Sequence, residues 1–254
     1  MRQPRLAEMV AAELRERIVD GRLADGGHLP ALDRLAREFD VSPPSIREAL
    51  RILENERLIT VRRGSVGGAE VHRPKPDAAA YMLGLVLQAS ETPAADLAQA
   101  LTQLVTVCAG MCARRKDRAK SVVPALRRSI SESLAHIENA VEMERWARQF
   151  HSDIIDGCGN ATLILVAGAL ERLWATQSEA WTYRVTHAHE APGSQLREQG
   201  LHEHVAIADA IEAGDAELAE KLLSEHVSNP QIYQVRKRGA RVRATDVSWQ
   251  APQQ

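Results

Sequence analysis

Arginine side chains gathered in two short stretches are the groups in this sequence best suited to chemistry. A guanidinium can bind guanine O6 and N7 with two hydrogen bonds, or it can neutralise a phosphate. A solvated protein surface also carries arginines, but five of them in one compact motif favour a nucleic-acid contact. The residues of these stretches that we assign to DNA are Arg34, Ser42, Ser45, Arg47, Arg51, Arg62, Arg63 and Gly64, with Arg57 close by.

Three helices must position these arginines. Apolar residues recur every four positions from Leu6 to Ile18, which predicts a first helix that stops at Asp20-Gly21. Pro30 opens a second helix, and Ser42 offers an N-cap oxygen to a third one that has Pro43 in its first turn.

After the third helix, the apolar period changes from 3.6 to 2. Residues 58–61 and 69–72 therefore read as two short strands around a glycine-rich turn, and we expect a winged helix-turn-helix domain over residues 1–72. The proline-bearing stretch of residues 73–78 reads as a stiff linker. The second helix of a helix-turn-helix motif, here the third helix of the domain, enters the major groove, with its first residues at the base edges.

The remainder of the chain shows only helical periodicity, in the ranges 77–90, 93–114, 118–138, 139–157, 161–183, 195–213 and 215–228. These ranges predict an all-α bundle of six or seven helices over residues 79–233. Residues 234–254 lack periodicity and carry five basic side chains before residue 245, so we expect a disordered basic tail.

Composition narrows the class of protein. Of 254 residues, 44% are apolar and 26% are charged, as in a soluble globular protein. We find no apolar run near the length of a membrane span, the longest being Ala78 to Ala89, and no signal peptide. Three cysteines are too few for a disulfide framework, which favours the cytoplasm. The net charge of −2 does not exclude DNA, because residues 1–73 hold 13 arginines against 12 acids and arrange them unevenly.

The first domain resembles that of GntR-type bacterial transcription regulators. The resemblance is carried by Leu29-Pro30-Ala31-Leu32-Asp33-Arg34-Leu35-Ala36, by Val41-Ser42-Pro43-Pro44-Ser45-Ile46-Arg47-Glu48-Ala49-Leu50 and by Arg63-Gly64. It implies a homodimer on a palindromic DNA operator. Pro43 and Asp33 stand where the family usually has arginine, so the operator should differ from the common half-site.

The second domain resembles the FCD effector-binding domain of the FadR-like branch, on Phe150-His151, Gly159-Asn160, His204, Gly214-Asp215 and Glu225-His226. The resemblance implies a divalent metal, zinc or similar, held by His151, His204 and His226. The family's aspartate position, one turn before the first histidine, is Ala147. The alternative is a set of pocket histidines that hydrogen-bond the effector or each other without metal.

The same resemblance implies a small-molecule effector, an organic acid or an acyl compound, at His151, His204, His226 and Asn160. Trp174 is a large aromatic residue that we expect to help line the pocket, although such residues more often belong to a core. No Lys or Arg occurs between Met82 and Ala113, which favours a weakly charged pocket and an apolar effector unless this stretch is simply a core helix. Cys108 and Cys112 could bind metal or sense oxidation, although buried free thiols fit better.

These features predict a ligand-responsive transcription regulator, with repression as the default and the linker as the transmitting element. Two alternatives remain at this point. One is a metal-dependent enzyme built on the three histidines, although no His-Glu-x-x-His motif is present. The other is a DNA-binding protein that responds to no ligand.

Overall fold

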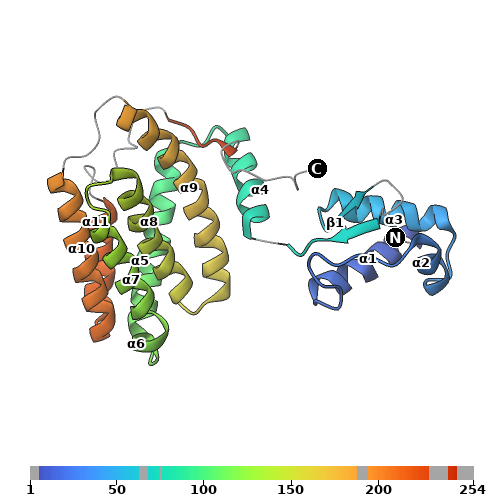
Figure 1. Cartoon of the computed structure of the whole chain (residues 1–254), viewed down its shortest axis with the longest axis horizontal. Helices are drawn as coiled ribbons and strands as arrows, with labels where there is room; N and C mark the ends of the chain where they lie inside the picture. The colour runs from blue at the N-terminus through green and yellow to red at the C-terminus, as the bar shows by residue number, and fades with distance from the viewer. Residues whose placement is uncertain (1–5, 63–67, 75, 188–193, 229–239, 245–254) are drawn as a thin grey trace. The chain divides into compact units, whose positions relative to one another are not determined.

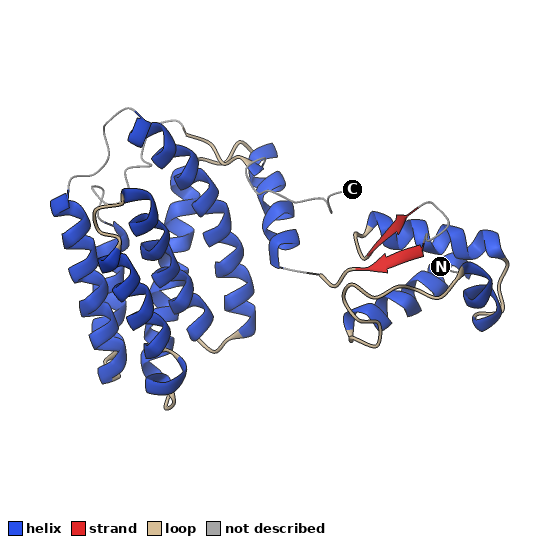
Figure 2. Cartoon of the chain, in the orientation of Figure 1, coloured by secondary structure: helices blue, strands red, loops and turns tan. Residues whose placement is uncertain are grey.

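The computed structural model describes residues 6–62, 68–74, 76–187, 194–228 and 240–244. The chain divides into two compact units, Met1–Lys75 and Pro76–Gln254. The first holds three helices and a two-stranded sheet, and the described part of the second is built from helices (Figures 1 and 2). The predicted fold class, a winged helix-turn-helix followed by an all-α bundle, is confirmed.

In the first unit, α1 (Leu6–Val19), α2 (Leu32–Glu38) and α3 (Pro43–Asn55) precede β1 (Ile59–Arg62) and β2 (Gly68–Val71). The strands are antiparallel, with Ile59 opposite Val71, and lie one residue from the positions that the sequence predicted. Aliphatic side chains from all three helices and from the sheet form one core, with Leu14, Leu35, Ile46 and Ile59 almost fully buried. This core fixes which face of α3 remains in solvent.

The linker is shorter than the predicted residues 73–78. The Arg73 backbone N–H donates to Asp25 Oδ1 over 2.9 Å, and its guanidinium donates to the Val19 carbonyl over 2.8 Å, so Arg73 belongs to the first unit. At the other end, Pro76 already begins α4, because proline is well tolerated in the first helical turn.

The second unit contains α4 (Pro76–Ala89), α5 (Ala94–Arg114), α6 (Arg118–Ser121), α7 (Val123–Ala135), α8 (Ala140–Gly157), α9 (Ala161–His187), α10 (Ser194–Ala213) and α11 (Ala216–Ser228). The single helix predicted over residues 118–138 is wrong, because it is broken at Val122 into α6 and α7. Pro124 explains the break: its ring would clash with a carbonyl of the preceding turn if one helix ran through.

Helix α5 lies at the centre of this unit and packs against α8, α9, α10 and α11. Among the described residues it alone is long and apolar enough to cross a membrane, whereas the sequence analysis found no apolar run near that length. Its apolar side is the core of the bundle, where Val105, Cys108 and Cys112 are buried beside Phe150 and Ile207. Helix α5 is therefore a core helix, which was one of the two interpretations of a stretch without Lys or Arg.

The prediction of a disordered tail is wrong for residues 240–244. The Ala94 and Val242 backbone N–H groups donate to Ala240 and Thr92 carbonyls, and the Ala244 N–H donates to Gln88 Oε1 over 2.7 Å. Val242 and Ala244 are buried, and Val242 packs in a cluster with Leu97, Leu101, Leu170, Leu173 and Trp174. Alternating small apolar residues in this stretch allow it to lie along the α4–α5 turn. The rest of the predicted tail lies outside the described residues.

Candidate functional site

The exposed face of α3 carries the polar residues that the sequence assigned to DNA. Ile46, Ala49 and Leu53 point into the core, which leaves Arg47 and Arg51 in solvent. Ser42 is the N-cap residue, but its Oγ lies 3.0 Å from Ser45 Oγ and makes no cap bond to the backbone. Both hydroxyls are therefore paired with each other at the start of the helix.

Ion pairs distinguish the arginines of α1 from those of α3. Arg15 donates two hydrogen bonds to Glu56, and Arg17 contacts both Glu13 and Glu38 within 2.7 Å. On α3, by contrast, the Arg51 side chain is 77% exposed, with only Glu48 at 3.7 Å. In the described residues no ion pair is recorded for Arg47. Arg47 and Arg51 of the predicted recognition helix are therefore among the cationic groups that a partner can contact.

The other predicted DNA residues have separate positions. Arg34 is exposed on α2, and Arg57 is exposed just after α3 with a φ of 60°. The backbone of Arg62 ends β1, whereas its side chain, Arg63 and Gly64 lie outside the described residues.

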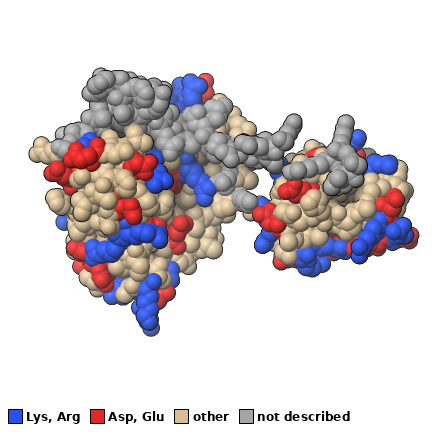
Figure 3. Space-filling model, viewed as in Figure 1, with Lys and Arg blue, Asp and Glu red and all other residues tan. Residues whose placement is uncertain are grey.

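Acidic and basic groups are interspersed on the face drawn in Figure 3, which agrees with the small net charge.

In the second unit, α8, α10 and α11 bring His151, His204 and His226 together. The three side chains are buried, and one ligand nitrogen from each lies within 4.8 Å of the others. His202, two positions before His204, is exposed. The structure therefore brings His204, and not His202, into the cluster, as the sequence predicted.

Three contacts orient the rings of this cluster. The His204 ring stacks on Phe150 with centroids 4.1 Å apart, and its Nε2 lies 3.0 Å from His226 Nε2. His226 Nδ1 lies 2.6 Å from Glu203 Oε2. This hydrogen bond lowers the pKa of Glu203, so the carboxylate stays ionised beside the cluster.

Burial keeps the imidazoles of His151 and His204 neutral. Loss of water lowers the pKa of His151 to about 3 and that of His204 well below 6.5, with a smaller contribution from the neighbouring His226. Neutral imidazole is the form that binds a metal ion. His151 and His204 are therefore in their ligand form at neutral pH without any prior deprotonation.

Among the described residues, no carboxylate belongs to the metal-ligating group formed by the three histidines. Ala147 occupies the position one turn before His151, as the sequence indicated. Asp153 is buried on the same helix, but it accepts hydrogen bonds from Ser129 Oγ at 2.5 Å and Gln149 Nε2 at 2.9 Å. It is thus engaged with α7 and with its own helix.

Charged residues that the sequence analysis missed share the helix face of His151. Arg148 lies one turn before His151, its side chain is 17% exposed, and its Nη1 is 3.7 Å from Glu144 Oε1. On α9, Glu171 is buried, and burial raises its pKa to about 7, against the opposing effect of Arg148. The spacing 144, 148 and 151 follows a helix face and could have revealed this group. The prediction of a weakly charged surrounding is therefore wrong, because it considered α5 alone.

Two further predicted effector residues have structural roles. Asn160 is exposed, and its Oδ1 accepts hydrogen bonds from the backbone N–H groups of Thr162 and Leu163, so it caps α9. Trp174 packs in the aliphatic cluster with Val242 rather than in the core cluster around Phe150. Neither arrangement supports a role in effector binding.

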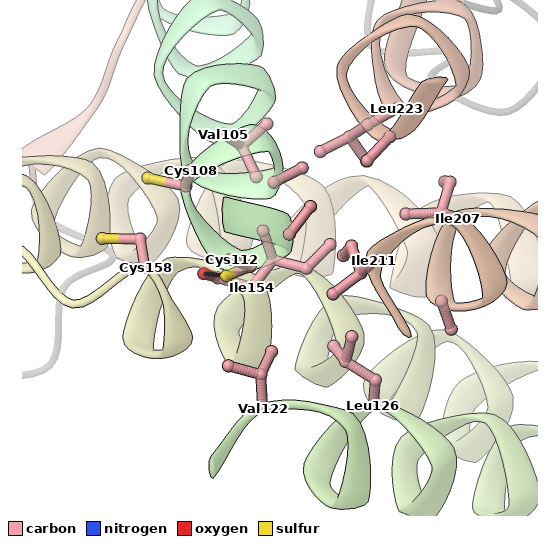
Figure 4. Packing of buried hydrophobic residues seen from close by; sticks show 14 of the residues in the cluster. Val105, Cys108, Cys112, Val122, Leu126, Ile154, Cys158, Ile207, Ile211 and Leu223 are labelled. Carbon is pink, nitrogen blue, oxygen red and sulfur yellow. Dashed lines mark hydrogen bonds between the residues drawn. The ribbon is translucent and has the colours of Figure 1, made fainter. Parts of the chain in front are cut away.

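The three cysteines are free and buried, as predicted for structural thiols. They lie among the aliphatic side chains of the core, and Cys112 Sγ donates to the Ile154 carbonyl over 3.2 Å (Figure 4). Burial raises the pKa of Cys108 and of Cys112 to about 12. The reactive thiolate form is therefore scarce at neutral pH.

Comparison with known proteins gives two family matches. The family described as bacterial regulatory proteins, gntR family, matches residues 6–67, and the FCD domain matches residues 92–229. The Exu regulon transcriptional regulator of Escherichia coli K12 is 27% identical over 236 residues, covering 90% of this chain and 84% of that protein. The HTH-type transcriptional repressor NanR of Klebsiella aerogenes is 24% identical over 227 residues, covering 89% and 84%.

Among solved structures, Streptococcus agalactiae GntR superposes with a TM-score of 0.60 at 20% identity, covering 89% of this chain and 98% of that one. This likeness concerns the fold. The family matches together span both units and account for the winged helix and for the helical bundle. The chain belongs to the GntR family of bacterial regulatory proteins, with an FCD domain as its second unit, and is therefore a transcription regulator and not an enzyme.

Proposed function

We propose that this regulator is a repressor that binds a palindromic operator as a homodimer and releases it when a small organic acid binds at the histidine cluster. The observation that carries the proposal is a buried cluster of three histidines in a unit other than the one that contains the DNA-binding helix. The relative named NanR is called a repressor, which supports repression. A cytoplasmic location follows from the need to reach DNA.

The proposed DNA contacts divide by role. Arg47 and Arg51 read or flank base edges from α3, while Ser42, Ser45 and Arg34 bind phosphates. Arg62, Arg63 and Gly64 of the wing bind the minor groove or backbone. Pro43 removes an arginine contact usual in the family, so the half-site should differ from the common one.

Arg47→Ala tests the recognition helix. A duplex selected by the purified protein from a random pool serves as the probe, and fluorescence anisotropy measures affinity over a range of salt concentrations. Loss of a base contact should weaken binding by about 5- to 150-fold, whereas loss of a phosphate contact should reduce the salt slope by about 1.

The matched control is Arg145→Ala, which removes an arginine that is 61% exposed on α8 of the second unit. It should leave the affinity unchanged. Binding of the Arg47→Ala variant within twofold of the unaltered protein would show that the recognition helix is assigned wrongly.

We further propose that His151, His204 and His226 hold a divalent metal such as zinc. Their donor set fits: three imidazole nitrogens within 4.8 Å of one another suit zinc, which takes three protein nitrogens and leaves a position for a ligand. A bound ion would supply positive charge for the effector carboxylate. Elemental analysis of protein never exposed to chelator should find about one ion per chain, lost in His151→Ala, and finding none would exclude the site.

The effector class follows from the charges on α8. Arg148, one turn before His151, supplies the cation that α5 lacks, so a carboxylate of an organic acid or acyl compound is the group we expect to bind there. Binding must favour the DNA-free state, because an effector shifts an equilibrium only by its differential affinity for the two states. The linker between the units is the proposed transmitting element.

A thermal-shift screen of organic acids, fatty acids and acyl-CoAs identifies the effector, since a ligand that binds only the folded protein raises its melting temperature. The hit should also weaken operator binding. If no compound changes either property, the protein is a DNA-binding regulator that responds to no small molecule of these classes.

A further inference from the structure

A carboxylate lies immediately behind one of the three histidines. Glu203 Oε2 is 2.6 Å from His226 Nδ1, the ring nitrogen on the side away from the cluster. Glu203 is next to His204 on α10. Two consecutive residues of α10 therefore supply one imidazole of the cluster and the carboxylate that contacts His226 on α11. The His226 side chain is 2% exposed and that of Glu203 is 29% exposed, so water competes little at the imidazole.

This hydrogen bond determines which nitrogen of His226 carries the proton. An ionised carboxylate only accepts hydrogen bonds, so Nδ1 must donate, and Nε2 is left with its lone pair. That Nε2 points to the cluster, 3.0 Å from Nε2 of His204. His226 is therefore held with the lone pair of its Nε2 directed toward the other rings of the cluster.

His204 is oriented by different means. Its Nδ1 is buried and has no hydrogen-bond partner among the residues that the structure describes, and its ring is instead fixed by stacking on Phe150. A carboxylate thus supports one imidazole of the pair and an aromatic ring supports the other. The supporting role of Glu203 is specific to His226.

We propose that Glu203 is a positioning residue for the metal centre, and that it replaces from behind His226 the carboxylate that Ala147 does not supply. This inference rests on the proposed metal site. A carboxylate that accepts from a ligating imidazole fixes its tautomer and raises its basicity, and losing such a partner costs about 10- to 100-fold in metal affinity. Glu203 also places a negative charge near the ion. Imidazole ligands carry no negative charge, so this carboxylate offsets part of the positive charge of the ion.

Zinc affinity of the full chain, measured by competition with a chromophoric chelator at pH 7.5, tests the proposal. Glu203→Ala should weaken zinc binding by about 10- to 100-fold, and Glu203→Gln by less, because an amide oxygen still accepts from Nδ1–H. Glu198→Ala, an exposed glutamate one and a half turns earlier on α10, is the matched control and should change nothing.

Nitrogen-15 NMR of the metal-free protein gives a second readout, independent of zinc. His226 should be the Nδ1–H tautomer in the unaltered protein and a mixture of tautomers in Glu203→Ala. Melting temperatures establish whether each variant is folded. If Glu203→Ala is not folded, the same measurements on Glu203→Gln test the proposal.

The outcomes separate the two proposals. Zinc binding that does not depend on Glu203, or an Nε2–H tautomer of His226, overturns the positioning role alone. If the unaltered protein binds no zinc, the metal site itself falls and the positioning role with it.

Discussion

Replacing Glu171 with glutamine should stabilise the helical unit above neutral pH and leave its stability nearly unchanged in mild acid. Glu171 is 7% exposed on α9, and burial raises the pKa of its carboxyl from an ordinary 4.5 to about 7. The folded protein therefore keeps a proton on Glu171 that the unfolded chain releases at lower pH. Between these two pKa values the unfolded state binds fewer protons, so stability falls as the pH rises.

The magnitude follows from the two pKa values. Each tenfold change in an ionisation equilibrium corresponds to about 1.4 kcal/mol, so ionising Glu171 in the folded state costs about 3 kcal/mol relative to the unfolded chain. This stability is fully present below pH 4.5 and lost by the time the pH has passed 7. Glutamine has the shape of the protonated acid but does not ionise, so the variant does not lose this stability as the pH rises.

Differential scanning fluorimetry of both proteins from pH 5 to pH 8 measures the effect. A protein of this size changes its melting temperature by about 2–4 °C per kcal/mol. We therefore expect Glu171→Gln to melt within about 2 °C of the unaltered protein at pH 5 and about 6–12 °C above it at pH 8.

Glu198→Gln, at an exposed position on α10, is the control and should follow the unaltered protein at every pH. A difference between Glu171→Gln and the unaltered protein that is the same at pH 5 and pH 8 would refute the reasoning. It would mean that Glu171 does not retain its proton in the folded state.

Three further predictions concern the helical unit. Cys108, Cys112 and Cys158 should resist iodoacetamide in the native protein and react after denaturation, as read by mass spectrometry, and fast native labelling would contradict their burial. Val242→Asp, which places a charge at a position that is 1% exposed, should destabilise the unit by about 2 kcal/mol or more in chemical denaturation, whereas Arg243→Asp beside it, at an exposed position, should not. Ser129→Ala removes a donor from buried Asp153 and should cost about 1–3 kcal/mol, and an unchanged denaturation midpoint would show that the bond contributes nothing.

The sequence was most informative where a period or a local motif determines structure. The four-residue repeat from Leu6 to Ile18 and the Ser-Pro start of α3 are local signals, so the winged helix was predictable to within a residue or two. The histidines came from a family resemblance, because nothing local relates His151 to residues on α10 and α11.

The errors have a common cause, which is that tertiary contacts carry no local signal. Residues 240–244 read as tail because their partners, Gln88 to Ala94, are about 150 positions away. The charge near the histidines was misjudged because α5 was considered without α8 and α9, which supply Arg148 and Glu171. Trp174 was assigned to the effector for its size, whereas its packing belongs to the Val242 cluster.

The backbone bonds between residues 240–244 and the α4–α5 turn have a consequence for synthesis on the ribosome. The DNA-binding unit is contiguous and its last residues are near position 75, so it can fold as soon as it leaves the exit tunnel. The helical unit can close only after residue 244 has been made, which at usual elongation rates is roughly 10–30 s later. During that interval the nascent chain carries a folded DNA-binding unit while its helical unit is still incomplete.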